Sequence, residues 1–280
     1  MIARMTGAAM RGLLVALLIA TPALLLPGIV ADQTQIVVLV AVIASIMTFI
    51  EYNSNAPSIV EFRDAAPFNR LRFITLFLIV FLLTAIAKGK TEPTMLTASL
   101  TSIGTVIGNA IDFPYSPVRL VVLMLPGDAT IDTINSVRTA AGLAYMISLV
   151  AMIVFVAMVR ILGWPTRSGA FNVWVNLPLF DPTAGGDVLY RLQRDARINI
   201  ALGFLLPFII PAVVKAAAVL IDPISLDNTQ TLIWTISAWA FLPASMIMRG
   251  IAMNRIAELI EEKRRRAYAS AAEDVEFQTA

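Results

Sequence analysis

Three groups of side chains in this sequence could do chemistry or bind a charged partner. In the apolar stretch LLPFIIPAVVKAAAVL, Lys215 follows Pro207 and Pro211 at intervals of four residues. Residues four apart share one side of a helix, so the prolines should bend or break the helix on the side that carries the amine. An ionisable side chain on a broken apolar helix is typical of a solute site in a transporter. Alternatively, the long side chain of Lys215 simply reaches the membrane surface.

The second group lies in the polar stretch EYNSNAPSIVEFRDAAPFNRLRF, residues 51–73. It holds four charged residues that could dock a partner protein through complementary charges: Glu61, Arg63, Asp64 and Arg70. The alternative is a connector that carries arginines only because it lies on the cytoplasmic side of a membrane.

The third group is the basic run near the C-terminus, which consists of Lys263, Arg264, Arg265 and Arg266. Such a run can bind anionic lipid head groups with about 1 kcal/mol per basic residue close to the surface. A nucleic-acid partner is not expected, because six basic and six acidic residues balance from Arg249 onward.

The absent residue types narrow the chemistry further. The chain contains no histidine and no cysteine, which excludes disulfides, the usual ligands of zinc and iron–sulfur clusters, and histidine-based acid–base catalysis. The sequence has neither paired carboxylates within its apolar runs nor a nucleophile motif. We therefore expect no cofactor and no enzymatic activity.

The composition of the chain then indicates the kind of fold that holds these residues. Of the 280 residues, 58% are hydrophobic and 14% are charged, against about 25% charged in soluble domains. A membrane-spanning helix needs about 20 mostly apolar residues. Six runs meet or approach this length: 12–30, 35–52, 71–88, 139–162, 198–221 and 230–248. The sequence predicts an all-α, multi-pass protein of a plasma membrane, such as a bacterial inner membrane.

The first run could instead be a cleaved signal peptide, because Arg4 and Arg11 precede its apolar core. A small-x-small cleavage site would place small residues around Ala31, but Ile29 occupies one of those positions. We therefore expect this run to be retained as the first span.

Positive charge predicts the orientation of the spans. With both termini in the cytoplasm, 16 of the 21 lysines and arginines fall in cytoplasmic segments. Four fall in outer segments: Lys88, Lys90, Arg119 and Arg138. This bias predicts six crossings, and it requires the segment 94–127 to cross the membrane either not at all or an even number of times.

The segment 94–127 contains two weaker apolar runs, 94–111 and 117–126. One interpretation is an amphipathic helix on the outer surface; the other is a re-entrant hairpin. The second run is short and has Arg119 near its start, which favours the surface helix. Gly104 and Gly108 form a small-xxx-small pair that suits close helix packing.

Local patterns predict structure in the two cytoplasmic loops. Ser58 and Glu61 match a capping box, which predicts a short helix over 59–65 with Phe62 dipping into the membrane surface. Pro67 would end this helix. In the second loop, Asp187 can cap the helix that leads into the fifth span.

The chain divides into a transmembrane domain, 1–250, and a cytoplasmic amphipathic helix with an acidic tail, 251–280. Ile256, Leu259 and Ile260 form the apolar stripe of that helix. The polar residues gather at the surface, so we expect a scaffold, assembly factor or accessory subunit that binds another membrane protein. The alternative is a small-solute or lipid transporter that uses Lys215 and the proline-broken fifth span.

Overall fold

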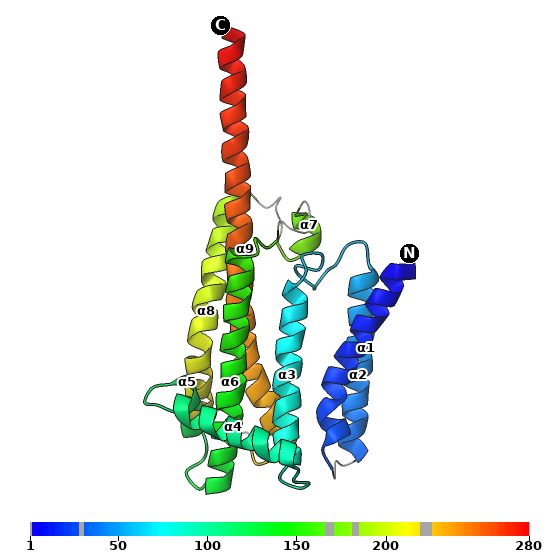
Figure 1. Cartoon of the computed structure of the whole chain (residues 1–280), viewed down its shortest axis with the longest axis vertical. Helices are drawn as coiled ribbons and strands as arrows, with labels where there is room; N and C mark the ends of the chain where they lie inside the picture. Colours follow the sequence, from blue (N-terminus) through cyan, green and yellow to red (C-terminus); the bar gives the residue numbers. More distant parts are fainter. Residues whose placement is uncertain (1, 28–30, 166–170, 181–184, 219–225, 280) are drawn as a thin grey trace.

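The protein is described here by a computed structural model that covers residues 2–27, 31–165, 171–180, 185–218 and 226–279 (Figure 1). Each of its six long apolar helices overlaps one of the six predicted spans. They are α1 (Ile2–Leu25), α2 (Ala31–Asn53), α3 (Phe68–Lys88), α6 (Ile131–Arg160), α8 (Val188–Ala217) and α9 (Thr229–Thr279). No strand occurs in the residues that the structure describes. The prediction of an all-α, multi-pass membrane protein is confirmed.

Both ends of the chain lie at one end of the helix bundle (Figure 1). The loops after α2 and α6 lie at the same end, which we call the arginine-rich end. The opposite end carries α4 (Met95–Ile111) and α5 (Pro117–Leu123). Both ends of the chain thus lie at the same end of six helices that are long and apolar enough to cross a membrane.

Helix α4 runs crosswise over α6 and α3 rather than along the bundle (Figure 1). Thr94 caps its start by accepting a hydrogen bond from the backbone of Thr97. Leu96, Ile103 and Val106 are exposed on one face. This is the arrangement of an amphipathic helix at a membrane surface, the first of the two interpretations of segment 94–127.

Small residues let the helices approach closely. A Cβ atom added at Gly142 of α6 would lie 2.4 Å from the Cα atom of Gly108, so α4 and α6 touch through their backbones. Gly104 faces Thr139 in the same contact, which confirms that Gly104 and Gly108 lie on the packing face. Gly203 of α8 meets the backbone of α9 in the same way.

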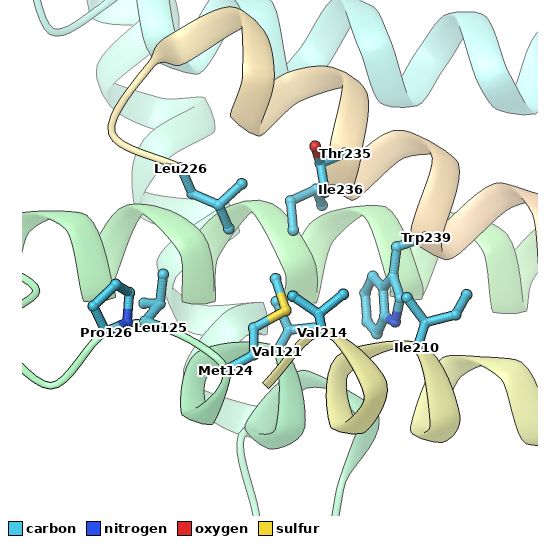
Figure 2. A pocket seen from close by; sticks show the side chains of 10 residues that line it. All are labelled: Val121, Met124, Leu125, Pro126, Ile210, Val214, Leu226, Thr235, Ile236 and Trp239. Atoms are coloured by element: carbon cyan, nitrogen blue, oxygen red, sulfur yellow. The ribbon is translucent and has the colours of Figure 1, made fainter. Parts of the chain in front are cut away.

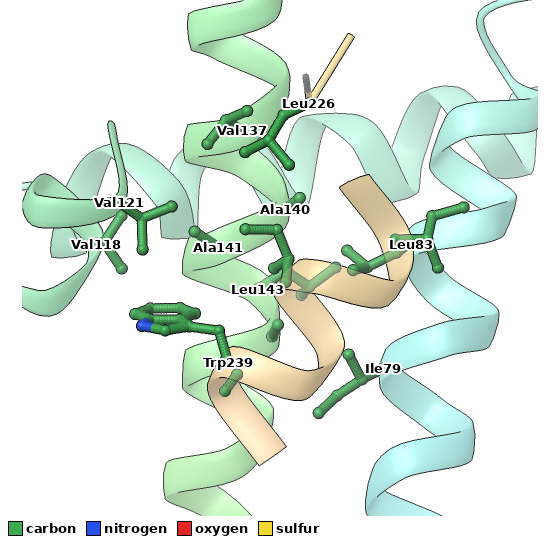
Figure 3. Close-up of a cluster of buried hydrophobic side chains, with 14 of the residues drawn as sticks. Ile79, Leu83, Val118, Val121, Val137, Ala140, Ala141, Leu143, Leu226 and Trp239 are labelled. Carbon is green, nitrogen blue, oxygen red and sulfur yellow. The ribbon is translucent and has the colours of Figure 1, made fainter. Parts of the chain in front are cut away.

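The main core lies in the half of the bundle near the opposite end (Figure 3). Ile79, Leu83, Val137, Ile236 and Trp239 bring α3, α6 and α9 together there. The hairpin of α1 and α2 packs on this unit through α1 and α3. Most of α2 is exposed and apolar, as expected of a helix that faces lipid.

Candidate functional site

The loop after α2 does not form the predicted helix over 59–65; it consists of turns and bends. Its backbone is organised by Glu51, the acidic residue in the last turn of α2. The Glu51 carboxylate accepts hydrogen bonds from three consecutive backbone N–H groups, 58–60, and from the Ser58 hydroxyl. Ser58 therefore does not cap a helix. Phe62 adopts φ of 52°, which is incompatible with a right-handed helix.

The sequence pattern predicted that Phe62 dips into the membrane surface, but it does not. Its side chain is fully buried, with ring centroids 4.7 Å from Phe68 and 5.7 Å from Trp164. The Trp164 indole N–H donates to the carbonyl oxygen of Ala65 at 3.1 Å. The Phe62 N–H donates to the carbonyl oxygen of Asn176, which belongs to the short helix α7 (Val173–Asn176). The loop is thus a packed layer over the helix ends.

Glu61 is the most internal of the four predicted docking residues. Its carboxylate forms a two-point ion pair with the Arg249 guanidinium of α9, with N–O distances of 2.5 and 2.7 Å. The Glu61 side chain is only 8% exposed. Asn69 also donates to its carbonyl oxygen. Glu61 therefore holds the loop against α9 and has little surface left to offer a partner.

The other three predicted docking residues divide between the interior and the surface. The Arg63 guanidinium donates to the carbonyl oxygens of Glu51 and Ser54 at 3.0 and 2.7 Å, and its side chain is 8% exposed. It also pairs with Asp64. Asp64 and Arg70 are exposed. The loop thus presents two of its four charged residues to solvent.

The C-terminal apolar stripe covers the protein's own core rather than lipid. Ile256 is 1% exposed, and Leu259 and Ile260 pack against the same cluster as Phe62. Helix α9 continues without interruption through residue 250, so the predicted domain boundary lies within one helix. The amphipathic segment is an extension of the sixth span.

The C-terminal part of α9 projects beyond the rest of the bundle (Figure 1). The basic run Lys263–Arg266 is exposed there. Arg264 forms an ion pair of 2.9 Å with Asp187 at the start of α8. Asp187 also accepts the backbone N–H of Leu189, which confirms its predicted role as a cap. These two donors lower the pKa of Asp187 below its ordinary value.

Lys215 is an exposed residue in the last turn of α8, and its amine donates to the carbonyl oxygen of Leu125 at 2.9 Å. Helix α8 is continuous through Pro207 and Pro211, so the predicted break does not occur. Pro211 has no N–H, which frees the carbonyl oxygen of Pro207. The indole N–H of Trp239 donates to this oxygen at 3.1 Å, so α9 supplies the missing hydrogen bond.

A small cavity lies beside this part of α8 (Figure 2). Its volume is about 40 Å³, and its walls include Ile210, Val214 and Trp239. That volume accommodates a few water molecules. Lys215 does not line it. The cavity is too small for an organic solute, so it gives no support to a transport site at Lys215.

A larger pocket of about 510 Å³ lies at the opposite end, and our sequence analysis missed it. Residues from the end of α3, from α4, and from the starts of α6 and α9 line it. The threonines and serines of run 94–111 were visible in the sequence. Nothing in the sequence indicated that three other segments would complete the pocket around them.

The described residues contain no group of three or more acidic side chains arranged to hold a metal ion. Comparisons with models of protein families, with curated proteins and with solved structures found no match for this chain.

Proposed function

We propose that this protein is a non-enzymatic membrane scaffold or accessory subunit, which holds a partner protein at its arginine-rich end. The observation that carries this proposal is the charged extension of α9 beyond Ile260, which is continuous with the sixth span and is exposed over nearly all of 261–270. A helix that is polar on all sides gains little from its own chain, and such a helix commonly bridges to another body.

A largely buried ion pair fixes the base of this extension, and a second, half-exposed pair adds at most about 1 kcal/mol. Arg249 binds Glu61 of the first loop, and Arg264 binds Asp187 at the start of α8. They join α9 to two separate segments on either side of its exit from the bundle. A rigid base favours the docking of a protein, because less conformational freedom is lost on binding.

The position of the basic run favours a protein partner over lipid. About 14 residues separate Arg249 from Lys263, or about 21 Å of helix. Charges attract across about 8 Å at physiological ionic strength. Lipid head groups level with Arg249 would thus be out of reach while α9 is straight. Lys263, Arg265 and Arg266 suit an acidic protein surface, which makes anionic lipid the less favoured partner.

Site-specific photocross-linking in native membranes tests this proposal. A photoreactive residue at position 265 should give a discrete protein adduct that is lost in high salt. The triple variant K263Q/R265Q/R266Q should weaken its copurification. R160Q/R194Q/R197Q, which removes three charges at the same end but outside α9, is the matched control. Adducts to lipid alone, or equal loss in both triples, would contradict the proposal.

We infer that the membrane is a plasma membrane, such as a bacterial inner membrane, with the arginine-rich end in the cytoplasm. Support comes from the excess of lysine and arginine at that end, 16 residues against four.

A further inference from the structure

The 510 Å³ pocket at the opposite end has the size of a small-ligand site, since such sites are typically about 300–1,000 Å³. The charged residues of the pocket are exposed: Lys90 lies two residues after α3, Asp132 is in the first turn of α6, and Asp227 lies two residues before α9. Apolar residues of the lining are buried, such as Leu83 and Ala140. Leu83 lies five residues before the end of α3 at Lys88, or about 8 Å of helix. The pocket therefore suits a ligand with a polar head and an apolar body.

Charges of both signs line the polar part. The Lys90 amine donates to the Ser136 hydroxyl at 2.5 Å, and among the described residues no carboxylate lies within ion-pair distance of it. Asp227 accepts a hydrogen bond from the Thr133 hydroxyl at 2.6 Å. A simple anion would face two carboxylates, and a simple cation would face the amine. A zwitterion satisfies both.

Hydroxyl groups occupy most of the remaining polar wall. They come from three helices: Thr101 and Thr105 of α4, Thr133, Ser136 and Thr139 of α6, and Thr229 of α9. Hydroxyl donors suit the several oxygen atoms of a phosphate ester. The pocket also lies beside α4, which crosses the end of the bundle and exposes an apolar face of Leu96, Ile103 and Val106, as a helix on a membrane surface does.

We propose that this pocket binds the phosphate–ammonium head of an outer-leaflet phospholipid, phosphatidylethanolamine. The phosphate lies at Lys90 and the neighbouring hydroxyls. The ammonium lies at Asp132 and Asp227. The first carbons of the acyl chains lie over Leu83 and the other apolar residues of the floor. This lipid site is independent of the partner proposed for α9.

Native mass spectrometry of the detergent-purified full chain tests the lipid site. Phosphatidylethanolamine should be retained about tenfold better than phosphatidylglycerol, which lacks the ammonium. Lys90→Met should lower this retention about tenfold. Lys88→Met is the matched control: Lys88 pairs with Glu92 at 3.3 Å and does not line the pocket, so retention should be unchanged. Asp132→Asn should reduce the preference between the two lipids, because only Asp227 then remains to bind the ammonium.

Three results would overturn the proposal. They are equal retention in the Lys90 and Lys88 variants, equal retention of both lipids by the wild type, and full displacement of the lipid by free phosphoethanolamine. The last result would identify a soluble zwitterion as the ligand. Unfolding temperatures measured on the same samples show that each variant is folded.

Discussion

At the scale of single residues, the charged side chains of the first loop mostly hold the protein together. Glu61 and Arg63 resemble docking residues in the sequence, yet each is 8% exposed in its side chain and bound within the chain. Their partners are Arg249 and the carbonyl oxygens of Glu51 and Ser54. Charged side chains that are this buried stabilise the fold by pairing with other buried polar groups, and they have little surface left to bind another protein.

Glu61→Gln should therefore destabilise the fold. The change leaves Arg249, which is 28% exposed, without its carboxylate, at a cost of about 1–3 kcal/mol. Thermal unfolding in mild detergent measures this loss. Asp64→Asn is the control, since Asp64 is 59% exposed and its pair with Arg63 is worth at most about 1 kcal/mol. Equal losses of stability in the two variants would show that the Glu61–Arg249 pair stabilises the fold no more than the exposed pair does.

At the scale of elements, α9 supplies a hydrogen bond that the prolines remove from α8. The two prolines predicted a bend or a break, and a break would have exposed backbone groups for a solute. Instead, the freed oxygen of Pro207 is bound by Trp239 of α9, and the close contact at Gly203 brings the two helices near enough for this bond. A proline-rich span is thus compatible with a purely structural role when a neighbour supplies the donor.

Trp239→Phe tests this hydrogen bond. It keeps an aromatic ring but removes the N–H, so the Pro207 oxygen loses its donor in an apolar setting, which costs about 1–3 kcal/mol. Unfolding temperature in detergent is the measurement. Trp234→Phe makes the same chemical change at the edge of the core and should have the smaller effect. A larger effect at Trp234 would count against a role for the Trp239 hydrogen bond.

At the scale of the whole molecule, the bundle separates two kinds of surface. The arginine-rich end carries the packed loop layer and the projecting part of α9, while the opposite end carries α4 and the 510 Å³ pocket. The two ends of the bundle therefore differ in kind: one presents a charged helix and the other a pocket lined by polar and apolar residues.

The orientation itself is testable with reporter fusions. A reporter after Ala280 should be active as a cytoplasmic fusion, and one inserted after Leu226 should be active only outside, because 16 of the 21 basic residues hold the other end in the cytoplasm. The opposite assignment at either position would refute the topology.

The sequence by itself determined the membrane class, the six spans, the distribution of charge between the two ends and the cap at Asp187. These features depend on composition and on neighbours within a few residues, because a bilayer selects long apolar helices whatever their packing.

Only the tertiary structure decided which contacts Ser58, Glu61 and Lys215 make. Ser58 matched a capping box, but in the structure the N–H groups of Ser58 and Ile59 donate to the Glu51 carboxylate, and no helix forms there. Glu61 meets Arg249 across 188 positions of sequence, and the outer pocket needs four segments. Contacts between such distant positions follow from helix packing, which no local pattern of residues encodes.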